Sequence, residues 1–355
     1  MQRILITSTE AYSGKSGICL ALLSMLSARG RSVAYFKPYG TMPMSIDGVM
    51  TDKDAYYMNQ QVTPPAPPIE AVCPVLKTRA FVEGVMRGTT DDVRSRVVAA
   101  FEQVAQGRDV VVMEGPVDVF QGTAVGLSIC ELADLLQARV LVVTRPSGVE
   151  FPDELLGACG CLGDRLAGAL FNWVHPSNAD FVRDHVTPFL RRRNIPVFGA
   201  LPQDSSLASV SVHEIVDALQ ATVLSAENRL EEPVEAFMVG AMGQEKALRF
   251  FRRKGRKAVI TGGDRADVQL AALETDTRAL ILTGNLPPSS LVLARADEIG
   301  VPMLLVDMDT LTAVERLDSL MGRTRIHDPG KAAKIRESLE TNADVPGLLK
   351  AFGID

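Results

Sequence analysis

The chain has 355 residues, 46% of them hydrophobic and 23% charged, and a formal net charge of -6 at pH 7. This composition excludes a disordered or fibrous chain and fits a globular protein of about two domains. The negative charge gives no general attraction to nucleic acid, and no apolar run reaches about 18 residues, so neither nucleic acid nor a membrane is expected as a partner. The first six residues form a strand pattern rather than a signal peptide, which favours a cytoplasmic location.

The five cysteines lie in apolar surroundings and have no paired metal-ligand spacing. We expect all five to be reduced, as in a cytoplasmic protein. The segment Gly157–Cys161 superficially resembles the turn that carries a nucleophilic cysteine. It falls within a helical stretch and has no base positioned beside it, so a thiol nucleophile is not expected.

The N-terminal strand, predicted over 2–7, leads into a loop that ends in Gly14-Lys15-Ser16, where an apolar helix over about 15–29 begins. In this order of parts, backbone N–H groups point at anionic oxygens, a lysine adds a mobile positive charge, and a serine hydroxyl can ligate Mg²⁺. The match to G-x-x-x-x-G-K-S/T is imperfect because Thr9 stands where the pattern has glycine. We predict a nucleotide phosphate site, with a structural loop as the alternative.

Further apolar runs alternate with helical stretches along the first 200 residues. Continuous apolar runs of this kind are typical of a parallel sheet covered by helices on both faces. The fold class expected is therefore α/β, with a sheet of the P-loop NTPase type followed by a smaller α/β domain. Strands are predicted over 32–36, 110–113, 139–143, 168–172 and 196–199, and a helix over about 92–106.

Charged residues follow two of these strands, at the edge where open parallel sheets bind their ligands. Lys37 can reach the same phosphates as Lys15, or is a solvated lysine before a turn. Glu114 ends a buried strand beside the loop and suits an Mg²⁺ site, directly or through water. Asp52 and Asp54 either cap a helix and charge its first turn or face the metal as carboxylates.

The second half restarts an α/β pattern at about Ser211, with a strand over 238–242 and a helix over 244–254. Gly262 and Gly263 allow a tight turn after the next apolar run, and Asp264 is expected to cap the helix that follows. This helix N-terminus is either a pocket for a small anion or nucleotide or a cap and nothing more.

Two basic runs, 191–193 and 252–257, resemble nucleic-acid patches. They are interpreted instead as helix C-termini, where cations suit the dipole and where Gly255 ends the second helix.

Residues 1–204 resemble dethiobiotin synthetase and its relatives, including cobyrinic acid a,c-diamide synthase. Residues 8–16 are more similar still to the amino-terminal part of long bacterial phosphate acetyltransferases. The residues that carry the resemblance are Ser13–Ser16, Phe36-Lys37-Pro38, Asp54, Met113-Glu114-Gly115, Asn172 and Gly199–Pro202.

The resemblance implies that this domain binds ATP and Mg²⁺. Lys15 and Lys37 are the implied catalytic residues, and Asn172 and Pro202 would flank the adenine. Ser16, Asp54 and Glu114 are the implied metal ligands. The implied nucleotide contacts are Thr9, Glu10, Ser13, Gly14, Lys15, Ser16, Gly17, Lys37, Asn172 and Pro202.

Residues 205–330 resemble the DRTGG domain, and 331–355 are predicted to form a helical C-terminal tail. A second ligand site in the DRTGG domain would comprise Gly262, Gly263, Asp264 and Arg265. The long phosphate acetyltransferases carry their catalytic domain after this region, so the chain is not expected to be that enzyme by itself.

Two functions remain open. The first is an Mg-ATP-binding regulatory or sensory protein that acts on a separate acetyltransferase or another metabolic enzyme. The second is an ATP-dependent ligase of the dethiobiotin synthetase or diamide synthase type, in which a carboxylate of an unknown acceptor attacks the γ-phosphoryl group beside Lys15, Lys37 and Mg²⁺. The diamide synthases also carry a glutaminase domain, which this sequence does not show. The resemblance further implies a homo-oligomer.

Overall fold

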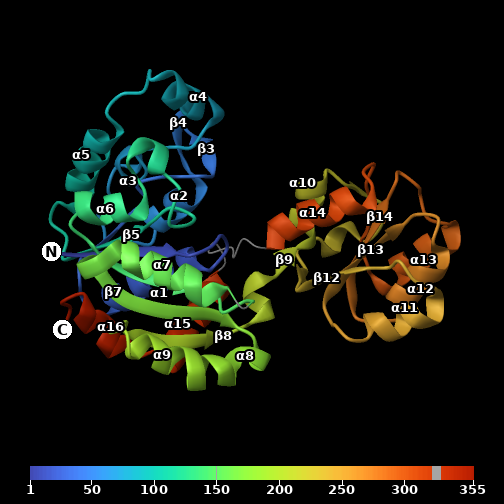
Figure 1. Ribbon diagram of the computed structural model, residues 1–355. Helices are drawn as coiled ribbons and strands as arrows, with labels where there is room; N and C mark the ends of the chain where they lie inside the picture. Colours follow the sequence, from blue (N-terminus) through green and yellow to red (C-terminus); the bar gives the residue numbers. More distant parts are fainter. Residues whose placement is uncertain (149, 322–328) are drawn as a thin grey trace. The chain divides into compact units, whose positions relative to one another are not determined.

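The computed structural model describes residues 1–148, 150–321 and 329–355, and it divides the chain into two compact units. The first unit comprises Met1–Gln203 together with the two C-terminal helices, and the second runs from Asp204 to the end of α14. Residues 322–328 of the predicted second domain lie outside the described residues. Figure 1 shows the elements of each unit.

The first unit is built on a six-stranded sheet in which every neighbouring pair of strands is parallel. The five residues of β5 are all buried, as are the last five of β1 and of β6, which explains the continuous apolar runs. Helices lie on both faces (Figure 1), so the predicted α/β fold class is confirmed. The strand order is β2 (Val33–Phe36), β5 (Val110–Glu114), β1 (Gln2–Ser8), β6 (Arg139–Thr144), β7 (Leu166–Val174) and β8 (Val197–Pro202).

The helices of the first unit include two from the C-terminus that return to the sheet. Helix α15 packs along α1 and against β8, while α16 packs against β7. The α-helices are α1 (Lys15–Ala28), α2 (Lys53–Asn59), α3 (Ile69–Val72), α4 (Arg79–Arg87), α5 (Val93–Ala105), α6 (Ile129–Leu135), α7 (Phe151–Leu162), α8 (Pro176–Phe181), α9 (Thr187–Arg191), α15 (Pro329–Asn342) and α16 (Val345–Ala351).

A β-hairpin between β2 and α2 was not predicted. Its strands, β3 (Pro43–Ile46) and β4 (Val49–Asp52), pair antiparallel, and most of their residues are exposed or half-buried. A hairpin with so little burial has no strong apolar periodicity, so the sequence pattern does not reveal it. Its last residue, Asp52, is nevertheless buried and starts α2.

The second unit contains a five-stranded sheet with two apolar cores, one on each face. Ala258 and Ile260 of β13 pack with α10 and α14, whereas Val259, pointing the other way, packs with α11, α12 and α13. The sheet order is β10 (Thr222–Val223), β15 (Met303–Leu305), β14 (Thr277–Thr283), β13 (Lys257–Gly262) and β12 (Ala236–Val239), with only β10 antiparallel to its neighbour.

α-Helices and a short strand pair surround this sheet in the described part of the second unit. The helices are α10 (Val212–Leu219), α11 (Gln244–Phe251), α12 (Ala266–Leu273), α13 (Ser290–Ile299) and α14 (Thr310–Met321), and β9 (Val210–Ser211) pairs with β11 (Pro233–Val234).

Three local predictions were wrong. Helix α11 ends at Phe251 rather than at 254, and the last residue of the basic run, Lys257, is buried at the start of β13. Asp264 does not cap α12, because the chain makes one more turn and Arg265 takes the N-cap position. The cysteines are not all reduced: Cys130 of α6 and Cys161 of α7 form a disulfide, with Cα atoms 6.2 Å apart. These helices pack together although the two cysteines are 31 residues apart in sequence.

Candidate functional site

The loop between β1 and α1 is fixed from the side by β7. The side-chain amide of Asn172 donates to the Ser13 carbonyl at 2.8 Å. Gly14, the N-cap of α1, has φ 88°, and a Cβ there would clash with the same Asn172 amide nitrogen. Only glycine suits both the left-handed backbone and the close approach. Asn172 therefore holds the loop in place, and no side chain caps the N-terminus of α1.

Lys15 and Ser13 place polar groups at the buried side of this loop. The Lys15 ammonium donates to Ser8 Oγ at 2.5 Å and to the Val117 carbonyl at 2.8 Å. Burial, opposed by the charge of Glu114, lowers the pKa of Lys15 to about 8. The buried Ser13 hydroxyl has no hydrogen-bond partner within the described part of the chain. A buried hydroxyl without a partner is unusual and marks a position where a further polar group would fit.

Glu114, at the end of β5, is approached by polar groups from α1, from β2 and from Lys37, the residue that follows β2. Ser16 Oγ of α1 donates to Oε1 at 2.9 Å, and Tyr35 Oη of β2 donates to Oε2 at 2.7 Å. Lys37 Nζ lies 3.8 Å from Oε1. Burial, together with the charge of Glu114, raises the pKa of Tyr35 well above its ordinary value, so the phenol remains a neutral donor. Both Glu114 oxygens thus have fixed positions.

Lys37 is buried and held among carboxylates. Its ammonium lies 2.8 Å from Asp52 Oδ1 and 3.4 Å from Asp54 Oδ2. Burial disfavours its charge, but Glu114, Asp54 and Asp52 outweigh that effect and raise the pKa of Lys37 well above the ordinary lysine value. The solvated-lysine alternative is therefore wrong.

Asp52 and Asp54 have different roles in the fold. Asp52 is the N-cap of α2 and accepts backbone N–H bonds from Thr41, Met42, Asp54 and Ala55. Burial would raise its pKa, yet Lys37 and these donors hold it below the ordinary value. Burial raises the pKa of Asp54 to about 6, with Glu114 and Asp52 adding to the effect and Lys37 opposing it. Asp52 thus supports Lys37, whereas the Asp54 carboxylate is also affected by the charge of Glu114.

Thr9 and Glu10 attach the loop to β6. Thr9 Oγ1 and Thr144 Oγ1 are 2.9 Å apart, and Glu10 Oε1 accepts the backbone N–H of Arg145 at 3.1 Å. The Thr9 and Glu10 side chains are therefore hydrogen-bonded to Thr144 and Arg145 rather than to the residues around Glu114. Pro202, the last residue of β8, pairs with Val174 of β7.

The residues present fit a bound Mg²⁺–nucleotide. Gly14 and the uncovered helix N-terminus form a cradle, the Ser13 hydroxyl lacks a partner, and two lysines supply positive charge. Among the described residues, no group of three or more His, Cys, Asp or Glu side chains is arranged to hold a metal by itself. Mg²⁺ typically keeps several waters and phosphate oxygens, and so needs only one or two carboxylates such as those of Glu114 and Asp54.

The expected second site forms a closely packed loop between β13 and α12. Gly263 approaches the Leu286 carbonyl so closely that no Cβ fits there. Arg265 pairs with Asp267 at 3.1 Å, and the buried Gln269 donates to the carbonyls of Gly262 and Gly263 at 2.9 and 3.0 Å. Gln269 was not predicted, because a glutamine within an apolar helix gives no sequence sign of its partners.

Three further residues at the first site were also not predicted. Tyr35 lies inside an apolar run and could be read as core, and Arg145 and Trp173 follow no known motif. Arg145 lies over the Trp173 ring, 5.3 Å from its centroid.

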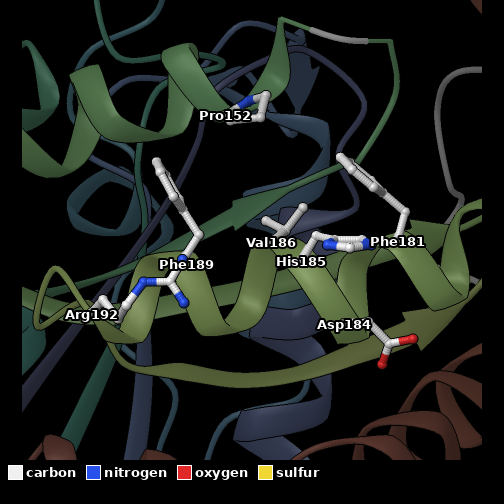
Figure 2. Close-up of a pocket in the computed structure, with 7 residues that line it drawn as sticks. All are labelled: Pro152, Phe181, Asp184, His185, Val186, Phe189 and Arg192. Atoms are coloured by element: carbon white, nitrogen blue, oxygen red, sulfur yellow. The ribbon is translucent and has the colours of Figure 1, made fainter.

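A separate hollow of about 430 Å³ lies between α7 and the segment that joins α8 to α9. Figure 2 shows Phe181 and Phe189 on either side of it, with Pro152 of α7 opposite Val186. The joining segment, Val182–Val186, is a π-helical turn. None of the phosphate-loop residues lines this hollow.

No helix in the described part of the chain combines the length and the apolar character that a membrane-spanning helix needs.

Comparison with known families gives two matches. The family described as AAA domain matches residues 2–211, and the family described as DRTGG domain matches residues 214–320. The predicted combination of a P-loop domain and a DRTGG domain is thereby confirmed.

Among individual proteins, the chain is 25% identical to the phosphate acetyltransferase of Pseudomonas putida, over 99% of this chain and 52% of that protein. It is 24% identical to the phosphate acetyltransferase of Synechocystis sp., over 89% of this chain and 46% of that protein. The chain therefore spans about half the length of these relatives.

Two solved structures show more distant similarity. The CBS and DRTGG domains of the regulatory region of Clostridium perfringens pyrophosphatase, complexed with diadenosine tetraphosphate, align at 25% identity and TM-score 0.29, over 40% of this chain and 69% of that one. The MinD cell division protein of Aquifex aeolicus aligns at 13% identity and TM-score 0.36, over 58% of this chain and 84% of that one.

Proposed function

The chain belongs to the AAA domain family, and from that premise we propose that it is an Mg-ATP-binding regulatory protein whose DRTGG domain carries a second ligand or assembly surface. The single observation that carries the proposal is the convergence on Glu114. Ser16 of the phosphate loop, Lys37 and Tyr35 all reach that carboxylate, beside the buried Lys15.

Each residue of this cluster would have a distinct task with the nucleotide bound. Loop N–H groups and Lys15 would hold the phosphates, because a helix N-terminus and an ammonium both favour anionic oxygens. Ser16 and Glu114 would take Mg²⁺, directly or through water, with Asp54 beside them. Asp52 would keep Lys37 in place, since their buried pair is 2.8 Å apart. Mg²⁺ would neutralise the phosphate charge there.

The regulatory part of the proposal is supported by the relatives. The two relatives compared above are phosphate acetyltransferases, and we propose a cytoplasmic homo-oligomer that acts on an acetyltransferase or another metabolic enzyme. An ATP-dependent ligase is the second candidate. The observation that favours it is the presence of two buried lysines, Lys15 and Lys37, on one phosphate site, since paired cations stabilise a transferring phosphoryl group.

ADP release from Mg-ATP separates these candidates. The regulatory proposal predicts saturable Mg-ATP binding and ADP release no faster than in a control without protein. Lys15→Ala is predicted to lose Mg-ATP binding. Lys53→Ala, which removes an exposed lysine at the start of α2, is the matched control and should bind as the wild type does. Turnover that a small carboxylic acid stimulates, and that Lys37→Ala abolishes, would replace the regulatory proposal with the ligase.

A further inference from the structure

The Cys130–Cys161 disulfide joins two helices of the first unit, and one of its two residues is exposed. Cys130 is the second residue of α6, and Cys161 is the last but one of α7. Cys161 is exposed, whereas Cys130 is half-buried. Disulfides on exposed residues are the ones that thiols reduce most readily. A thiol in solution can therefore reach this bond in the folded protein.

The other three cysteines are buried free thiols. Cys159 lies in α7 two residues before Cys161, but side chains two residues apart in a helix do not face each other. Burial raises the pKa of Cys159 to about 11, so its thiol stays protonated and poorly reactive. Burial likewise raises the pKa of Cys19 and of Cys73. Thiol chemistry in the folded protein is therefore directed to the Cys130–Cys161 pair.

Helix α6 packs directly on the residue that follows Glu114. Ile129, the neighbour of Cys130, is fully buried, and a Cβ on Gly115 would lie 2.9 Å from its Cδ1. The Gly115 N–H donates to the Ile6 carbonyl of β1 at 2.8 Å. Gly115 is thus held between β1 and the first turn of α6. A shift of α6 would therefore change the surroundings of the Glu114 carboxylate.

The segment 116–128, which leads into α6, also reaches the phosphate loop. The Val117 carbonyl accepts hydrogen bonds from Lys15 Nζ and from Ser8 Oγ, each at 2.8 Å. All of this segment lies within the described residues, and its regular structure is limited to the 3-10 turn Thr123–Val125. A segment with so little regular structure depends on its two ends for order, and its second end is α6.

We propose that this disulfide is a redox switch for the nucleotide site: the oxidised protein binds Mg-ATP tightly, and reduction of the Cys130–Cys161 bond weakens the binding. With the bond closed, α6 is fixed to α7, so segment 116–128 stays in the arrangement that places Lys15 and Glu114. With the bond open, the nucleotide must order this segment as it binds, which lowers the affinity. A disulfide in a cytoplasmic protein typically serves such a sensing role. This inference rests on the proposed nucleotide site and adds its regulation.

The switch uses a dithiol as the reductant. A thiolate of the dithiol attacks the exposed Cys161 sulfur, the bond to Cys130 breaks, and Cys130 leaves as a thiolate that takes up a proton. The second thiol of the reagent then displaces Cys161 from the mixed disulfide, and the reagent becomes a cyclic disulfide. Two electrons thus pass from the dithiol to the protein disulfide, and the two protons of the dithiol end on the two cysteine thiols. A small disulfide reverses these steps and closes the bond again.

Calorimetric titration of Mg-ATP into the oxidised protein, and into protein reduced with dithiothreitol, tests the switch. Alkylation followed by mass spectrometry establishes the state of Cys130 and Cys161 in each sample. Reduction is expected to weaken Mg-ATP binding by about fivefold or more, the lower end of typical coupling between two sites. Equal affinity in the two states, or tighter binding after reduction, would overturn the switch alone. Absence of Mg-ATP binding in both states would remove the nucleotide site itself, and the switch with it.

Two variants locate the effect. Cys161→Ser removes the bond at an exposed position, so it is expected to bind Mg-ATP as the reduced wild type does, with no response to dithiothreitol. Cys159→Ala is the matched control, because Cys159 lies in the same helix outside the disulfide, and its response should equal that of the wild type. A dithiothreitol response that persists in Cys161→Ser would assign the effect to another group and refute the proposal.

Hydrogen exchange without nucleotide provides a measurement that does not depend on binding. Amides of residues 117–128 should exchange faster after reduction, whereas those of α12 in the second unit should exchange at the same rate in both states. Unchanged exchange throughout 117–128 would show that the disulfide does not hold this segment, and the proposed link to the phosphate loop would be wrong.

Discussion

Gly14→Ala perturbs the point where the phosphate loop meets β7, and the structure provides a matched control for it. Gly14 has φ 88°, and a Cβ there would clash with the Asn172 amide. Gly48, in the turn of the β3–β4 hairpin, has φ 82° and no atom within 4 Å of such a Cβ. Both glycines belong to the first unit, so one unfolding transition reports on both.

The difference between the two variants isolates the Asn172 contact. Each substitution places an L-residue in the left-handed region, at a cost of roughly 1–2 kcal/mol. Gly14→Ala also displaces Asn172 from the Ser13 carbonyl, which adds about 1 kcal/mol for a lost hydrogen bond. We therefore expect Gly14→Ala to lower the free energy of unfolding by about 1 kcal/mol more than Gly48→Ala does.

Urea denaturation followed by tryptophan emission measures this, because Trp173 lies in the first unit. A parallel Mg-ATP titration should show weakened binding for Gly14→Ala and wild-type binding for Gly48→Ala. Equal destabilisation by the two variants, with unchanged nucleotide binding, would refute the account of how the loop is held.

Four further predictions concern other parts of the chain. Tyr35→Phe removes the hydroxyl that donates to Glu114 Oε2, so we expect the free energy of unfolding in urea to fall by about 1–3 kcal/mol. We also expect ATP binding to require a higher Mg²⁺ concentration. An unchanged Mg²⁺ requirement would contradict the role of Tyr35 in positioning Glu114. Gln269→Leu removes two hydrogen bonds to the loop before α12 and should lower the stability of the second unit by about 1–3 kcal/mol. Hydrogen exchange of the α12 amides measures this loss, and protection equal to that of the wild type would contradict the role of Gln269. Burial lowers the pKa of Lys257 to about 8, so the unfolded chain binds more protons above that pH; stability of the second unit should rise from pH 8 toward the ordinary lysine pKa, and Lys257→Met should abolish this rise in hydrogen exchange. In alkylation followed by mass spectrometry, Cys130 and Cys161 should be labelled only after reduction, and the buried Cys19 and Cys73 only after unfolding; rapid labelling of Cys161 in the untreated protein would disprove the disulfide.

The central strands of both sheets were predictable, because buried parallel strands require continuous apolar runs. The phosphate-loop lysine and serine were also readable, since a strand, a loop and an apolar helix follow one another within residues 2–29. The groups brought beside them from β2 and β5 were predictable only as strand ends. Their partners were not, because Lys37 and Asp52 are joined through an exposed hairpin with no periodicity.

The surfaces on which the helices pack could likewise not be predicted from the sequence. A helical C-terminal tail was predicted over 331–355, but the sequence pattern did not indicate which surface its apolar residues would cover. In the structure, Ile335 of α15 packs on Gly17, where a Cβ would lie 2.9 Å from its Cδ1. The bulge that turns Trp173 toward Arg145 could not be seen either, since a one-residue register shift leaves the apolar run intact.

The central claim is that the cluster around Lys15 and Glu114 binds Mg-ATP, and calorimetric titration tests it most directly. Mg-ATP titrated into the wild-type protein is predicted to bind saturably. Binding is predicted to disappear in Lys15→Ala without loss of the folded state, as judged by an unchanged circular dichroism spectrum. Equal Mg-ATP affinity in wild type and Lys15→Ala would contradict the phosphate-loop account.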